Sequence, residues 1–149
     1  MSQDISGFGT QIRIIASNTF PNGFTITQFA DDADPVDNPA TVVGDKAMGL
    51  NGDLITWSKA TPLDITLNVI PASDDDQNLA ILLDANLVGA GRTSAQDVIT
   101  LAILYPDGTN TTYSTGKMIS GVTTSSIASS GRKKTKPYAF SFESKSGIA

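Results

Sequence analysis

Alternating apolar and polar positions predict that most of this chain forms β-strands. The alternation is most regular in residues 64–70, where Ile65, Leu67 and Val69 share one face and polar residues take the other, as in a half-buried strand. Further apolar or alternating runs predict strands at residues 11–17, 24–29, 41–50, 54–60, 97–105, 110–120 and 138–143. In the last of these, Tyr138, Phe140 and Phe142 share a face.

Turn residues separate these runs and predict that neighbouring strands are antiparallel. The Pro-Asn-Gly triplet at residues 21–23 predicts a hairpin turn between the first two runs. Asn51-Gly52 predicts a second hairpin, in which Ile55 and Trp57 would share a face. Residues 106–109 predict a third turn. The strand at 97–105 has little polar content, so we expect it to be covered on both faces.

One helix is predicted at about residues 74–88. Its leucines recur at the spacing i, i+3, i+4 and i+8, which gives one apolar stripe: Leu79, Leu82, Leu83 and Leu87. Ser73 and Asp76 resemble a weakened capping box, and the aspartates at residues 74–76 suit the positive end of the helix dipole. These three aspartates are therefore interpreted as helix-capping residues rather than catalytic ones.

We expect one mainly β domain over residues 1–149: an antiparallel β-sandwich or open barrel of about seven or eight strands with one flanking helix. The expected connecting segments are a flexible arm at residues 1–10, an acidic loop at 30–40, and a mobile Ser/Thr/Gly-rich loop at 121–136 that ends in basic residues. No apolar run approaches the ~20 residues that span a bilayer. The first residues lack the features of a secretory signal, so we expect synthesis in the cytoplasm.

The absence of Cys and His excludes most familiar catalytic chemistry. Thiolate nucleophiles, Ser-His-Asp triads and nearly all zinc and copper sites need these residues. The acidic loop does not match the EF-hand pattern, and no phosphate-binding glycine loop is followed by a helix and lysine. We therefore expect no enzyme activity, no catalytic residues, no metal and no cofactor. The net charge of −5 argues against tight binding of nucleic acid backbones.

The charges are divided unevenly along the chain. Residues 1–91 hold twelve Asp against three cations, whereas residues 92–149 hold seven cations against three carboxylates. If the two dense clusters lie on different faces, copies of the chain can attract head to tail, and such heterologous contacts build rings or open tubes. Each cluster could instead be a solvated loop. The predicted subunit interface comprises Asp31, Asp32, Asp34, Asp37, Arg132, Lys133, Lys134 and Lys136.

The order of elements resembles the tail tube proteins of contractile-tailed bacteriophages. The resemblance extends over about residues 10–145 and includes the strand ending in Phe29-Ala30-Asp31-Asp32, the hairpin around residues 49–52, and the strand–Pro71–Ser73–helix step. It implies a small β-sandwich with a side helix, six copies of which close into a ring. The rings stack into a hollow tube that a sheath encloses and that conducts DNA, as in contractile injection systems.

The resemblance also implies partners and a location. The partners would be other copies of the chain, the tail sheath protein, baseplate and tail terminator proteins, and the tape-measure protein and DNA that pass through the lumen. The protein would be located in the virion tail after assembly in the host cytoplasm, without a membrane partner. Two alternatives remain: a monomeric β-sandwich binding module of the carbohydrate-binding or adhesin type, and another ring-forming tail component such as a terminator or baseplate hub ring.

Overall fold

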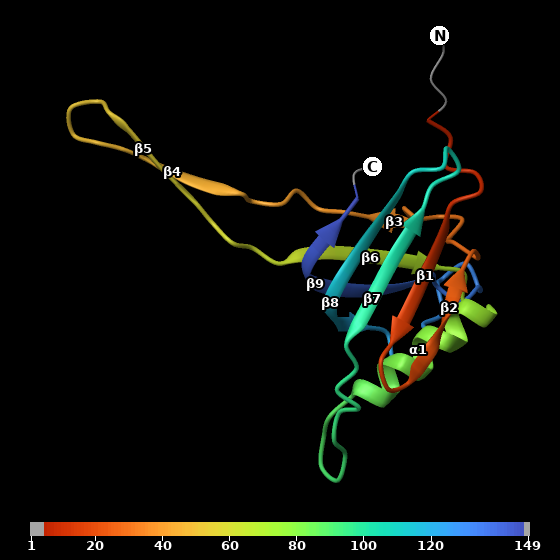
Figure 1. The fold of residues 1–149 in the computed structure, drawn as a ribbon. Coiled ribbons are helices and arrows are strands. Elements are labelled where there is room, and N and C mark those ends of the chain that lie inside the picture. Colours follow the sequence, from red (N-terminus) through yellow and green to blue (C-terminus); the bar gives the residue numbers. More distant parts are fainter. Residues whose placement is uncertain (1–4, 148–149) are drawn as a thin grey trace.

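The computed structural model describes residues 5–147, which form nine strands and one helix (Figure 1). The elements are β1 (Gln11–Ala16), β2 (Phe20–Ile26), β3 (Val36–Asp37), β4 (Gly44–Met48), β5 (Leu54–Ser58), β6 (Leu63–Val69), α1 (Asp74–Asn86), β7 (Ile99–Leu104), β8 (Asn110–Gly121) and β9 (Lys136–Ser146). Every strand pairing is antiparallel. The prediction of a mainly β, antiparallel fold with one helix is confirmed.

Seven of the strands form one open sheet in the order β2-β1-β7-β8-β9-β6-β3. Its two edge strands, β2 and β3, do not pair with each other, so the described part of the chain forms no closed barrel. The long strands β8 and β9 pass through both halves of the sheet, and Figure 1 shows β6 crossing the direction of β1 and β7. Register shifts in β8 opposite β7 and β9 permit this bend, since an extra residue bends a strand and increases its twist.

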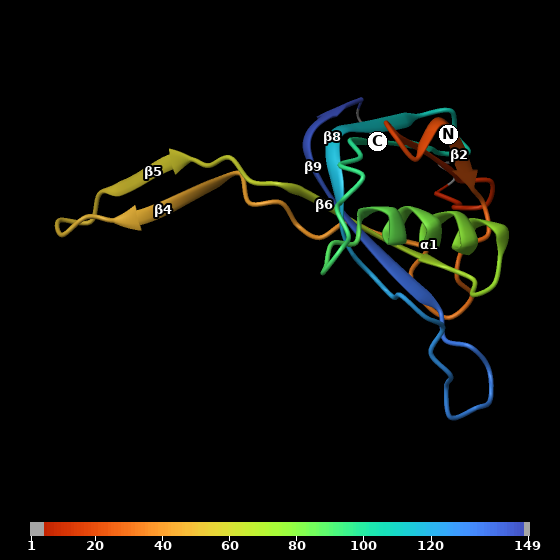
Figure 2. The same ribbon diagram turned by 90° about the horizontal axis from the view of Figure 1, so that it is seen from below.

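The core lies between α1 and one face of this sheet (Figure 2). Alternate residues of the strands point into it because side chains alternate across a strand. The fully buried side chains include Ile12, Ile14, Ile65, Leu67, Val69, Ile99, Leu101, Tyr138, Leu79 and Leu82. Phe140 and Phe142 extend the core beside them, with ring centroids 6.2 Å apart. The faces predicted for residues 64–70 and 138–142 are therefore confirmed.

The predicted position of the turn between the first two strands was wrong. Pro21, Asn22 and Gly23 lie inside β2 rather than in the turn, which is at residues 17–19. An edge strand tolerates proline because one of its sides has no partner. The register shift opposite Ile14 accommodates Gly23, whose φ is 75° and whose missing Cβ would lie 2.9 Å from the Ile14 carbonyl oxygen.

β7 is also less covered than expected, and the acidic loop is less irregular. Ile99, Leu101 and Ile103 are buried, but the intervening residues are partly accessible, because α1 covers only one face of the sheet. Within residues 30–40, Val36–Asp37 form the short strand β3, which pairs with Leu67 and Thr66 of β6. The apolar Val36 packs against the core, which explains this pairing.

α1 begins at Asp74 and ends at Asn86, two residues before the predicted end. Ser73 is the N-cap, and its Oγ accepts a hydrogen bond from the Asp76 backbone N–H at 3.2 Å. Of the predicted leucine stripe, Leu79 and Leu82 are fully buried and Leu83 is partly buried. Leu87 was predicted wrongly: it is the C-cap, past the last turn of the helix, and it is exposed. No helix in residues 5–147 is both long enough and apolar enough to cross a membrane.

Candidate assembly surfaces

The β4–β5 hairpin projects from the body of the molecule as a separate two-stranded sheet (Figures 1 and 2). The predicted Asn51-Gly52 turn joins the strands, and Gly52 has a φ of 89°. Every residue of β4 and β5 is exposed. The pairing places Trp57 opposite Asp45, and Ile55 opposite Ala47. One face of the hairpin is therefore largely apolar, as predicted for Ile55 and Trp57.

The projecting hairpin carries an unusual amount of exposed apolar surface. The large apolar side chains on it and beside it are Val42, Val43, Met48, Leu50, Leu54, Ile55 and Trp57, each roughly half exposed or more. Isolated two-stranded hairpins are marginally stable in water, and contiguous apolar patches on soluble proteins mark interaction sites. The hairpin is therefore the strongest candidate for a contact with another protein.

The acidic and basic clusters lie side by side in one chain. Arg132 donates hydrogen bonds to both carboxylate oxygens of Asp31, at 3.0 and 3.3 Å. The hydrogen bond from Arg132 holds the pKa of Asp31 below its ordinary value. Thr135 donates a short hydrogen bond to Asp32. The premise that the two clusters occupy different faces is therefore wrong.

The basic segment forms a loop with backbone hydrogen bonds of its own. The Ala128 N–H donates to the Arg132 carbonyl at 2.8 Å, and the Lys134 N–H donates to the Ser126 carbonyl at 2.7 Å. These bonds make a small hairpin-like loop, which projects from the body in Figure 2 (residues 122–135). Lys133 and Lys134 are exposed and form no ion pair with any residue between 5 and 147. Both line a cavity of about 420 Å³.

Lys136, predicted at the subunit interface, is a buried structural residue. Its Nζ lies 3.4 Å from Oδ1 of Asp76, and only 8% of its side chain is exposed. The Tyr138 hydroxyl donates to the same Oδ1 at 2.9 Å. Burial, together with this hydrogen bond to Asp76, raises the pKa of Tyr138 well above its ordinary value. Lys136 faces the core because it belongs to the alternating face of β9, a position that the run of basic residues conceals.

Two further aspartates have structural roles that the sequence did not indicate. Asp75 accepts hydrogen bonds from the backbone N–H groups of Thr27 and Gln28, both at 2.9 Å, and so links α1 to the end of β2. Asp97 accepts the N–H groups of Asn18 and Thr19 at the β1–β2 turn. Neither role leaves a local sequence signal, because each partner is more than 40 residues away.

The face of the sheet opposite the core is mainly small and polar. The strand pairings place Thr66 beside Ala139, Ala102 beside Thr112, and Asp64 beside Ser141 on this face. Its cations include Arg13, which donates to the Asn22 carbonyl at 2.6 Å, and Lys117. The face also carries the larger apolar side chains of Ile15 and Leu104, so it offers hydroxyl and apolar groups with few cations.

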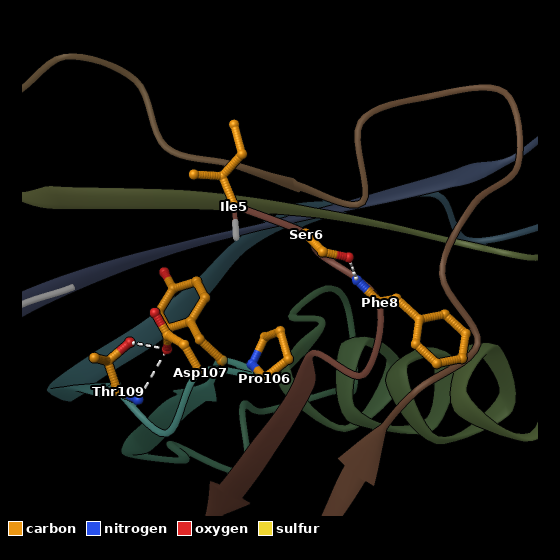
Figure 3. Close-up of a pocket in the computed structure, with 7 residues that line it drawn as sticks. Ile5, Ser6, Phe8, Pro106, Asp107 and Thr109 are labelled. Carbon is orange, nitrogen blue, oxygen red and sulfur yellow. Dashed lines mark hydrogen bonds between the residues drawn. The ribbon is translucent and has the colours of Figure 1, made fainter. Parts of the chain in front are cut away.

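A hollow of about 590 Å³ lies between the N-terminal arm and the β7–β8 turn (Figure 3). Figure 3 shows Ile5, Ser6 and Phe8 across from Pro106 and Asp107. Asp107 accepts two hydrogen bonds from Thr109, which lower its pKa. The predicted flexible arm lies partly outside the described residues; its described part makes a turn closed by the Thr10 N–H and the Gly7 carbonyl at 3.2 Å.

The comparisons with known proteins fit a structural role. The family model for "Tail fiber protein gp32" matches residues 3–146, nearly the whole chain. The chain belongs to the tail fiber protein gp32 family. The family and the solved structures that resemble the chain are structural tail proteins, not enzymes. No curated protein matches the chain in sequence.

Solved chains from contractile injection systems share the fold of this gp32-family protein. One comes from the PVC sheath/tube terminator of an extracellular contractile injection system in the extended state, at 13% identity and a TM-score of 0.59 over 100% of this chain and 99% of that chain. Another comes from the anti-feeding prophage baseplate, at 14% identity and a TM-score of 0.59 over 100% and 98% of the two chains. A third comes from the anti-feeding prophage tube terminating cap, at 8% identity and a TM-score of 0.59 over 100% and 93%. At these identities the likeness concerns the fold.

Proposed function

We propose that this gp32-family protein is a ring-forming subunit of a phage tail tube. Six copies close into a ring, and rings stack into a hollow conduit that a sheath surrounds. The open seven-stranded sheet carries the proposal: its edge strands β2 and β3 lack outer partners in the isolated chain. Exposed sheet edges invite further strand pairing, and a closed ring removes them.

The small polar face of the sheet suits the wall of such a conduit. DNA binds to surfaces rich in free lysine and arginine through its phosphates, so a wall of Thr, Ser and Ala with few cations lets it pass. The projecting β4–β5 hairpin suits a contact between copies, because its apolar face lacks a partner within residues 5–147. The tape-measure protein would occupy the same lumen before DNA, and baseplate and terminator proteins would contact the two ends of the tube.

Microscopy and sedimentation of the purified chain test this assignment. We expect rings and stacked tubes in negative stain, together with a sedimenting species larger than the 15.6 kDa monomer. Because tube growth can require a baseplate, cryo-EM of particles that contain the protein is the second arm of the test. A chain that remains monomeric at all concentrations and that lies outside the tube in particles would refute the proposal.

A single ring at the end of a tube is the second candidate. The likeness to chains from a sheath/tube terminator, a baseplate and a tube terminating cap favours it. The two candidates differ in stacking: a tube subunit repeats along the tail, whereas a terminator or hub occurs once. Counting copies per particle by quantitative mass spectrometry against the sheath protein separates them. An elongated rod outside the tube would instead support the fibre role in the family's description.

A further inference from the structure

The two projections of this chain leave opposite ends of the β6–β9 pair. The β4–β5 hairpin precedes β6 and departs beside Leu63, which pairs with Phe142. The basic loop at residues 122–135 joins β9 at Lys136, which pairs with Val69 at the other end of β6. Figure 2 shows the two projections pointing away from each other. The hairpin of one chain therefore does not reach its own basic loop.

The hairpin carries carboxylates without cationic partners. Asp45 and Asp53 are both exposed, and neither forms an ion pair with a described residue. Asp53 flanks the Asn51-Gly52 turn, beside the exposed Leu54. The stretch from Leu54 to Leu63 can span about 30 Å at roughly 3.3 Å per residue. Asp53 therefore lies at the outer end of the hairpin, whereas Asp45, opposite Trp57, lies nearer the body.

The basic loop presents the opposite charge beside a hollow. Arg132 is occupied by Asp31, so Lys133 and Lys134 are the cations left for a partner. They line the cavity of about 420 Å³ together with Ala128 and Asp32, and the Asp32 carboxylate already accepts a hydrogen bond from Thr135. Ile127, 63% exposed, lies directly opposite Lys133 in the loop and adds an apolar contact. The charge of the two lysines and the apolar side chain of Ile127 complement the exposed carboxylates and apolar side chains of the hairpin.

We propose that the β4–β5 hairpin of one copy docks on the basic loop of a second copy, with Asp45 and Asp53 facing Lys133 and Lys134. The inference rests on the proposed ring or tube assembly and specifies one of its contacts. The contact is heterologous, because two different surfaces of the same chain meet, and such contacts propagate into rings or tubes. This proposed contact takes the place of the predicted one between residues 31–37 of one copy and 132–136 of another. Arg132 and Asp31 instead pair with each other within one chain.

Charge reversal tests the contact. One variant carries Lys133→Glu with Lys134→Glu, and the other carries Asp45→Lys with Asp53→Lys. We expect each variant alone to remain unassembled under conditions in which the wild type forms rings or tubes. An equimolar mixture of the two should assemble, since each reversed hairpin then meets a reversed loop on the other variant. The protein carrying all four changes should also assemble.

The controls separate this contact from folding and from the assembly proposal. Lys117→Glu with Lys145→Glu changes the net charge equally but lies away from the loop, so it should assemble. Thermal melting should be unchanged in all variants, because the altered side chains are exposed. The contact is refuted, and the proposed function is not, if the wild type assembles and either reversed variant assembles too. The same holds if the wild type assembles and the mixture of the two variants does not. A wild type that never assembles, in isolation or in particles, would refute the contact and the proposed function together.

Discussion

Arg132 pairs with Asp31 across 101 residues of sequence, through hydrogen bonds of 3.0 and 3.3 Å to the two carboxylate oxygens. Two segments that looked like complementary interface patches are thus partners within one chain. The pair is exposed, so its contribution to folding is small and falls with added salt. It joins the basic loop to the acidic segment at residues 30–40.

The first prediction concerns the acidity of Asp31. Replacing Arg132 with Ala should raise the pKa of Asp31 toward its ordinary value of 3.8, because the hydrogen bond that lowers it is lost. Because the pKa of Asp31 is lower in the folded state than in the unfolded state, its ionised carboxylate stabilises the fold at pH values above the ordinary pKa. This stabilisation is lost as the pH falls through the folded-state pKa. Carboxyl carbon NMR titration measures the shift. Lys133→Ala is the matched control and should leave the pKa of Asp31 unchanged.

The second prediction compares neighbouring leucines of α1. Leu82→Ala should lower the free energy of unfolding by about 2–5 kcal/mol, because Leu82 is fully buried. Leu83→Ala should cost less, because Leu83 is only partly buried at the edge of the core. Chemical denaturation of both variants gives the comparison. Equal losses would mean that the helix is rotated relative to the sheet from the orientation described here.

Local periodicity explains how much of this fold could be predicted. The alternation at Ile65, Leu67 and Val69 and the leucine spacing in α1 are local patterns, and both give the buried face, except that Leu87 lies past the end of the helix and is exposed. β3 was missed because two residues show no periodicity, and it exists only because β6 lies beside Val36. The strand order, in which β7 lies between β1 and β8, depends on distant pairings that no local pattern encodes.

The candidate interface was harder to predict than the fold. Arg132, Lys133, Lys134 and Lys136 look alike in sequence, yet one is paired, two are exposed and one is buried. Only the position of each residue on β9 or the preceding loop distinguishes them. The detachment of the β4–β5 hairpin from the main sheet was likewise invisible, since an Asn-Gly turn predicts a hairpin whether or not the hairpin packs on a core.

The third prediction concerns Asp97 at the β1–β2 turn. Burial alone would raise its pKa, but hydrogen bonds from Thr19, Asn86 and two backbone N–H groups outweigh this effect and lower it. Asp97→Asn should therefore destabilise the protein by about 1.5–3 kcal/mol at pH 7, the typical contribution of a hydrogen bond to a charged group. The difference should begin to narrow as the pH falls below the ordinary value of 3.8, and it should disappear once the pH is below the lowered pKa of folded Asp97, where the wild-type side chain is also neutral. Denaturation at several pH values measures it, with the exposed Asp45→Asn as control.

The fourth prediction concerns the buried pair of Lys136 and Asp76. Asp76→Ala should cost about 3–5 kcal/mol, because it leaves the Lys136 ammonium buried without its partner. It also removes the acceptor for the Tyr138 hydroxyl and the Ala72 N–H. Lys136→Met should cost less, since Asp76 keeps both of these hydrogen bonds. Denaturation curves of the two variants decide the order, and a larger loss for Lys136→Met would contradict the described geometry.

The fifth prediction uses Trp57, the single tryptophan of the chain, as a reporter of hairpin docking. Trp57 is 48% exposed on the projecting hairpin, so the monomer should emit at the long wavelength typical of a solvated indole. Unfolding should change this emission little. Assembly should shift it to shorter wavelength, because docking on a neighbouring copy removes the indole from water. The unassembled Lys133→Glu, Lys134→Glu variant is the matched control and should keep the emission of the monomer. A wild-type assembly with unshifted emission would place the hairpin in solvent and contradict its proposed role.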